Sequence, residues 1–111
     1  MANTFKNAYL DVTSSAQTVY TAPSSAGNVG IVLTLRITNV DGATDDTITA
    51  DIVDASSGGA KIAHTMAVPA DSSVELAGTS KIVLEAGDSI QLTGGNASGD
   101  LEAFVSALEI T

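Results

Sequence analysis

The segment from Val29 to Asn39 alternates aliphatic and mostly polar residues, and this pattern constrains the fold more than any other feature. One set of alternate positions holds Val29, Ile31, Leu33, Leu35 and Ile37, and the other holds Val32, Thr34, Arg36 and Thr38. Successive side chains of a β-strand point to opposite faces, so a period of two is typical of a strand with one buried face. The segment therefore predicts a central strand with its five odd-numbered aliphatic residues in the core.

Further segments of the same kind follow one another along the chain, separated by runs rich in Gly, Ser, Asp and Pro. The predicted strands are Tyr9–Thr13, Gln17–Thr21, Val29–Asn39, Thr47–Val53, Lys61–Val68, Ser73–Leu76, Lys81–Leu84, Ser89–Thr93 and Leu101–Ile110. Strands of this length at roughly ten-residue spacing predict an all-β chain, a single β-sandwich of about 8 strands with jelly-roll or immunoglobulin-like topology. We expect residues 1–111 to form one domain, with residues 1–8 as an N-terminal arm.

The stretch from Lys81 to Thr93 reads as two short strands joined by a tight turn at Ala86-Gly87-Asp88. Gly87 can adopt the positive φ that such turns often need, and the Asp88 side chain can bond its own backbone across the turn. This segment is architectural and contains no reactive side chain.

The composition excludes several classes of function. Thirteen acidic residues against four Lys and Arg give a formal net charge of −9, which repels nucleic acid and anionic membranes. The chain has no Cys, and its longest aliphatic run, Ile31 to Leu33, is far too short to cross a bilayer. The N-terminal residues lack the apolar stretch of a secretory signal, so we expect a soluble protein made in the cytoplasm of a cell.

No constellation of residues predicts an enzyme. His64 is the single histidine and lies between Ile62 and Met66 on its strand face, so we expect a packed or interfacial side chain. The acidic turn at Asp41, Asp45 and Asp46 offers oxygen ligands, but its spacing does not match the calcium loop of an EF-hand. We therefore predict no catalytic residues, no cofactor and no metal site.

The last predicted strand is apolar on both faces. One face holds Leu101, Ala103, Val105 and Ala107, and the other holds Phe104, Leu108 and Ile110. A sandwich strand normally has water on one side, so the second face needs a cover. Either the N-terminal arm folds back over it or a neighbouring subunit packs there, and in both cases we expect Phe104 to be buried. The predicted interface consists of Phe5, Tyr9, Phe104, Leu108 and Ile110.

Several segments together resemble a family of small virion proteins of tailed bacteriophages. They are the opening MANTFKNA, residues 19–23 (VYTAP), the strand 29–39, residues 68–70 (VPA), residues 81–90 (KIVLEAGDSI) and the ending 106–111 (SALEIT). The resemblance covers nearly the whole chain, and its most specific parts are KIVLEAGDSI and the final LEIT. It implies a non-enzymatic, multi-copy structural component of the virion.

The first functional hypothesis is therefore a capsid decoration or cement protein that binds the outer shell in many copies. Its partners would be the major capsid protein or other virion proteins and copies of itself, with a trimer favoured. A neck or tail appendage is the alternative. A carbohydrate-binding module is a third possibility, since β-sandwiches often bind sugars, but only Tyr9 and Tyr20 could supply exposed tyrosine rings for stacking.

Overall fold

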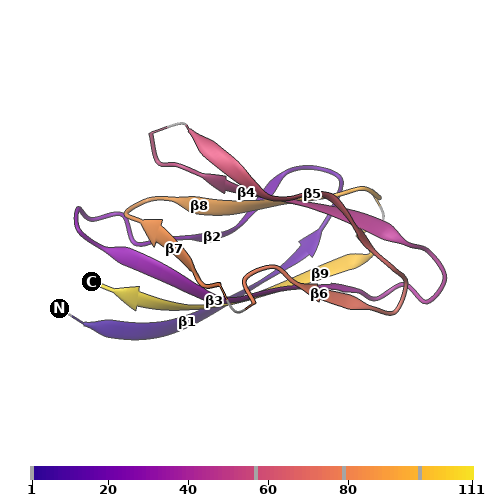
Figure 1. Cartoon of the computed structure of the whole chain (residues 1–111), viewed down its shortest axis with the longest axis horizontal. Coiled ribbons are helices and arrows are strands. Elements are labelled where there is room, and N and C mark those ends of the chain that lie inside the picture. Colours follow the sequence, from indigo (N-terminus) through magenta and orange to yellow (C-terminus); the bar gives the residue numbers. More distant parts are fainter. Residues whose placement is uncertain (1, 57, 79, 98) are drawn as a thin grey trace.

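The computed structural model describes residues 2–56, 58–78, 80–97 and 99–111, and these form two antiparallel β-sheets packed face to face (Figure 1). Sheet A consists of β1 (Asn3–Val12), β9 (Leu101–Ile110), β3 (Val29–Asn39), β6 (Ser73–Glu75) and β7 (Ile82–Glu85). Sheet B consists of β2 (Gln17–Thr21), β8 (Ser89–Gly94), β4 (Asp46–Val53) and β5 (Gly59–Val68). The predicted all-β sandwich is confirmed.

The strand order identifies the topology as a jelly roll rather than an immunoglobulin-like fold. Sheet A runs β1-β9-β3 and then β6 and β7, which both pair with β3 and so share one edge position. Sheet B runs β2-β8-β4-β5. If β6 and β7 are counted as one interrupted strand, the sandwich has eight strand positions. The first position pairs with the last (β1 with β9), the second with the second last (β2 with β8), and so on to β4 with β5. This is the pattern of the double-sheet jelly roll.

The central strand β3 contains a β-bulge that its sequence pattern did not predict. Val32 pairs with Ala107 of β9, but the next pair is Thr34 with Ser106, so Leu33 is an extra residue in β3. An extra residue exchanges the two faces of a strand beyond the bulge. β3 therefore directs even-numbered residues inward before the bulge and odd-numbered residues inward after it.

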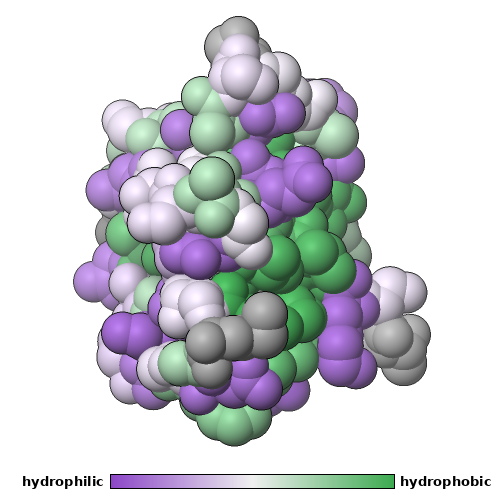
Figure 2. Space-filling model, turned by 90° about the vertical axis from the view of Figure 1, so that its left-hand side faces the viewer, coloured by the Kyte–Doolittle hydropathy of each residue, from purple (hydrophilic) through white to green (hydrophobic). Residues whose placement is uncertain are grey.

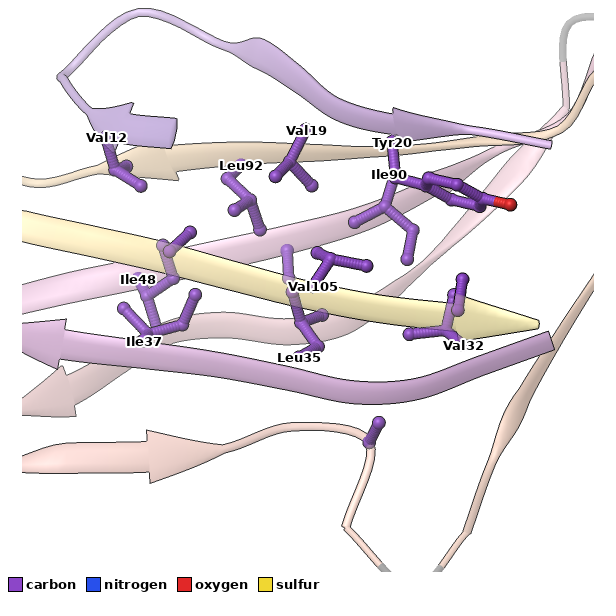
Figure 3. Packing of buried hydrophobic residues seen from close by; sticks show 14 of the residues in the cluster. Val12, Val19, Tyr20, Val32, Leu35, Ile37, Ile48, Ile90, Leu92 and Val105 are labelled. Atoms are coloured by element: carbon purple, nitrogen blue, oxygen red, sulfur yellow. The ribbon is translucent and has the colours of Figure 1, made fainter. Parts of the chain in front are cut away.

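Because of the bulge, the predicted core face of β3 is right after Leu33 and wrong before it. Leu35 and Ile37 are fully buried as predicted, whereas Val29, Ile31 and Leu33 are only partly buried. Val32, placed on the outer face by simple alternation, is fully buried. Figure 3 shows Val32, Leu35 and Ile37 pointing into the space between the sheets, together with Ile48, Ile90, Leu92 and Val105. The hydrophobic side chains of the core are all aliphatic apart from Tyr20, and the polar Asn39 and Asp46 are buried as well.

The N-terminal segment is a strand and not an arm. Residues 3–12 form β1, which pairs with β9 in an unbroken register from Asn3–Ile110 to Val12–Leu101; Met1 lies outside the described residues. The segment therefore extends sheet A sideways and does not fold back over the outer face of β9. The sequence pattern did not predict the first half of β1, because Lys6 on its inner face is charged and exposed, so the usual alternation of buried apolar residues is absent there.

The turn at residues 86–88 forms as predicted, but the strands it joins lie in different sheets. Gly87 has a φ of 81°, the Asp88 amide donates to the Glu85 carbonyl at 3.0 Å, and the Glu85 amide donates to the Asp88 carboxylate at 3.1 Å. β7 pairs with β3 in sheet A, whereas β8 pairs with β2 and β4 in sheet B. The turn therefore carries the chain from one layer of the sandwich to the other.

The bulge can be tested with a matched pair of substitutions. Val32→Asp places a carboxylate in the dry core and should prevent folding, because a buried unpaired charge costs several kcal/mol. Val83→Asp makes the same change on a side chain that is 62 % exposed and should shift the melting midpoint little. Thermal melts followed by circular dichroism would check both. Equal tolerance of the two changes would mean that Val32 faces outward, as plain alternation predicts.

Candidate functional surface

The outer face of sheet A carries a set of apolar side chains, four of them exposed and four partly exposed, which we call the apolar face. It comprises Phe5 and Tyr9 of β1, Phe104, Leu108 and Ile110 of β9, Val29 and Ile31 of β3 and Val83 of β7. The strand registers align Phe5, Leu108, Ile31 and Val83 in one row across four strands. Directly opposite residues on one sheet face lie in contact distance, so this row is continuous.

The five predicted interface residues all lie on this face, but they are less buried than expected. Phe5 is 75 % exposed, Tyr9 is 72 % exposed and Phe104 is 36 % exposed. The prediction that Phe104 is buried is therefore wrong for the single chain, because β1 pairs beside β9 instead of covering it. Tyr9 still contacts Phe104 from the neighbouring strand, with ring centroids 5.7 Å apart.

Three members of the apolar face, Val29, Ile31 and Val83, were not among the predicted interface residues. Ile31 was assigned to the core by simple alternation, and the pairing of Val83 beside Ile31 depends on strand connectivity that the pattern does not reveal. The one sequence signal was the run Ile31-Val32-Leu33, which is apolar on both faces of the strand. Hydrophobic residues also form a band at the end of the molecule where the two termini lie, with hydrophilic residues on both sides (Figure 2).

The outer face of sheet B has the opposite character. The registers place Thr49 beside Thr93 and Asp51 between Gln91 and Lys61. Lys61 and Asp51 form an ion pair at 2.9 Å. A sandwich in water normally exposes polar residues on both outer faces. The contrast between the two sheets therefore singles out the apolar face as the candidate site of interaction.

A carboxylate supports the apolar face at the bulge. One oxygen of Glu75 accepts hydrogen bonds from the Leu35 amide at 2.7 Å and from the Ala77 amide at 3.1 Å. The Leu76 amide donates to the Leu35 carbonyl at 2.8 Å. The amide and the carbonyl of Leu35 are thus both hydrogen-bonded, although neither β6 nor β7 pairs with β3 at this residue. Arg36 lies 3.9 Å from the second oxygen of Glu75 and is the cation next to Phe104 in the register.

A second polar contact ties the two sheets together beside the C-terminus. Tyr20 of β2 is buried, and its hydroxyl donates to a carboxylate oxygen of Glu109 in β9 at 2.7 Å. Burial, with smaller contributions from the hydrogen bond and the charge of Glu109, raises the pKa of Tyr20 well above its ordinary value. Glu109 lies between Leu108 and Ile110, so this contact fixes the end of β9 that contributes to the apolar face.

The other candidate residues do not form a site. His64 is exposed on the edge strand β5 and is therefore not packed. The carboxylates of the acidic turn each accept backbone hydrogen bonds: Asp41 from Ala43 and Thr44, Asp45 from Ala70, and Asp46 from Thr47, Gly95 and Asn96. Among residues 2–56, 58–78, 80–97 and 99–111, no group of three or more His, Cys, Asp or Glu could hold a metal ion.

No helix within the described part of the chain is long and apolar enough to cross a membrane.

Several solved structures share this fold. A chain of the Bacillus endospore appendages, a family of disulfide-linked pili, is 14 % identical with a TM-score of 0.58, and the likeness covers 99 % of this chain and 87 % of that one. A chain of infectious bursal disease virus strain Gx is 13 % identical with a TM-score of 0.51, covering 97 % of this chain but 31 % of that one. No protein-family model matches the sequence, and no curated protein matches it. At these identities the likenesses establish the fold alone.

The contact between Tyr20 and Glu109 predicts a loss of stability in alkali. The folded chain holds the Tyr20 proton to a higher pH than the unfolded chain, which releases it near pH ~10. The unfolded state therefore binds fewer protons above that pH, and the free energy of unfolding falls as pH rises further. Tyr20→Phe should remove this slope and cost about 1 kcal/mol at neutral pH. Urea titrations between pH 8 and 12 would measure both effects.

Tyr9→Phe is the matched control, since it removes a hydroxyl from an exposed side chain. It should leave the alkaline slope in place. An identical slope in the Tyr20→Phe variant would show that another group governs stability in alkali.

Proposed function

We propose that this protein is a non-enzymatic structural protein of a virion, which attaches in many copies to the outer shell of a capsid as a decoration or cement protein. The apolar face carries the proposal, because it gathers three of the four aromatic rings of the chain with aliphatic side chains on one outer face, whereas the outer face of sheet B is polar. Its partner would be the major capsid protein or another virion protein. The resemblance of the sequence to virion proteins of tailed bacteriophages supports the same class of partner.

The size of the apolar face favours repeated, individually weak attachment. The apolar row from Phe5 to Val83 crosses four strands at ~4.8 Å spacing, and the pair of Tyr9 and Phe104 lies four residues further along, so the face spans roughly 15 by 15 Å, about two hundred Å². The polar residues Asn7, Ser106 and Thr34 lie between the row and the aromatic pair. A stable complex of two proteins buries about 800 Å² on each partner. One such patch therefore binds weakly, and a lattice that offers many identical sites compensates through avidity.

The polarity of the two sheets supports a fixed orientation on the shell. With the apolar face against the particle, the outer face of sheet B would meet water with its threonines, Gln91 and the pair of Asp51 and Lys61. The net charge of −9 would then repel neighbouring particles and keep them dispersed.

The alternative within the same class is a neck or tail appendage, which would use the same face on fewer sites. A carbohydrate-binding module is less well supported, because Tyr20 is buried and only Tyr9 and Phe5 remain as strongly exposed rings. A glycan array at high protein concentration would detect that activity. Binding to a defined glycan, lost in a Tyr9→Ser variant, would favour it.

The copy number and position of the chain in purified particles test the proposal directly. Many copies on the shell, arranged with the capsid symmetry, would support a decoration protein. A small ring at the neck or tail would favour the appendage. Particles that lack the chain altogether would overturn both forms of the proposal.

The apolar face also predicts the outcome of a matched substitution. Val83→Ser should weaken binding to particles stripped of this protein, since Val83 lies in the apolar row and is 62 % exposed. Val40→Ser makes the same change at a side chain that is 53 % exposed but lies beyond the end of β3. Co-sedimentation with particles would compare the two, and their melting midpoints should match. Equal binding by both variants would place the attachment surface elsewhere.

A further inference from the structure

The four sheet edges of the sandwich are not equally protected against pairing with another chain. β6 and β7 are three and four residues long and are separated by residues 76–81. β2 has five residues and a register shift, and β5 has register shifts against β4 and a positive φ of 43° at Thr65. Short strands and bulges are the usual means of blocking edge pairing.

β1 is neither short nor bulged, and the inward-facing charge of Lys6 is its one feature of the kind that protects an edge. It is ten residues long, contains no proline, and pairs with β9 without any register shift. It is the last strand of sheet A on its side, and its first half runs along the lower border of the molecule in Figure 1. Lys6 and Asp11 are its two charged residues, so β1 has no net charge in a chain of −9. Two copies therefore repel each other less at this edge than elsewhere.

The hydrogen-bond pattern shows which backbone groups face outward. Ala2 and Thr111 exchange two backbone hydrogen bonds of 2.8 and 2.9 Å, so this pair is of the hydrogen-bonded type. Such pairs alternate along an antiparallel ladder. The amides and carbonyls of Thr4, Lys6, Ala8 and Leu10 consequently point to β9. Those of the odd-numbered residues from Asn3 to Asp11 point away from it.

We infer that β1 pairs antiparallel with β1 of a second copy of this chain, around a twofold axis between the two Asn7 residues. This register pairs all of residues 3–11 and joins only odd-numbered residues through hydrogen bonds, which is the set that faces outward. Phe5 then lies opposite Tyr9 of the second copy on the outer face, an aromatic cross-strand pair. A shift that places the axis at Lys6 would oppose two like charges.

The resulting dimer has one continuous sheet that unites both copies of sheet A. The two apolar faces lie on the same side of this sheet and meet at the aromatic residues of β1, which doubles the surface available to a partner. An edge that pairs with itself closes with two copies. The structure thus favours a dimer, where the sequence favoured a trimer. The inference goes beyond the proposed function, since it concerns the chain alone and is tested without particles.

Disulfide formation in single-cysteine variants tests the register, because the natural chain has no cysteine. Asn7→Cys would place two thiols across the axis at a Cα separation of about 5.5 Å, within the range of a disulfide. Ser106→Cys, directly beside it on β9, would leave about 15 Å between the two Cα atoms. With oxidised glutathione as the electron acceptor, Asn7→Cys should form a covalent dimer and Ser106→Cys should remain a monomer on a non-reducing gel. Equal cross-linking of both would indicate face-to-face contact and overturn the inference.

Analytical ultracentrifugation of the unmodified chain and two lysine variants gives an independent measurement. Asn7→Lys opposes two like charges at the axis and should raise the dimer dissociation constant at least tenfold. Ser106→Lys makes a similar change on the same face but one strand away, and should change it less than about threefold. Circular dichroism would verify that both variants fold. A natural chain that is monomeric up to millimolar concentration, or that forms trimers, would overturn the inference.

Discussion

The β-bulge at Leu33 is the constraint on which both the core and the candidate surface depend. With one extra residue, β3 supplies Val32 to the core on one side of the bulge and Leu35 and Ile37 on the other. The same change of face turns Ile31 outward, where it joins Leu108 and Val83. Without the bulge, the five odd-numbered aliphatic residues of β3 would point inward and Val32 would point outward, as plain alternation predicts.

The neighbouring edge of sheet A is divided at the same point as the bulge. On this side of β3, β7 pairs with Val29–Val32 before the extra residue and β6 with Arg36–Thr38 after it, and the chain leaves the sheet between them. The Glu75 carboxylate and the Leu76 amide bond the backbone of Leu35, so no polar group of Leu35 is left unsatisfied in the core. The interruption in turn protects this edge from pairing, which leaves β1 as the regular one.

The sequence revealed the strands well because most of them bury one face. Val29–Asn39, Gln17–Thr21 and Leu101–Ile110 were predicted with the bounds that the structure has. The buried face of β3 was predicted wrongly before residue 33, because the alternating pattern of the sequence does not reveal a bulge. The first half of β1 was not predicted, because Lys6 on its inner face is polar and exposed. The five predicted interface residues do share one face, since the two-sided pattern of β9 signalled it. Ile31 and Val83 required the strand order, which depends on contacts distant in sequence.

The two outer faces of the sandwich differ in polarity, so the two sides of the molecule are chemically distinct. In a jelly roll both sheets share one core, so core packing alone leaves the character of each outer face open. Here the outer face of sheet A collects aromatic and aliphatic side chains, although the chain has only two Phe and two Tyr. Three of these four rings lie on that face, and only Tyr20 is part of the core. Phe104 still packs against Tyr9, but the outward-facing surfaces of Phe5 and Tyr9 contribute little to folding stability, and their position on this face agrees with the proposed attachment of the apolar face to a partner.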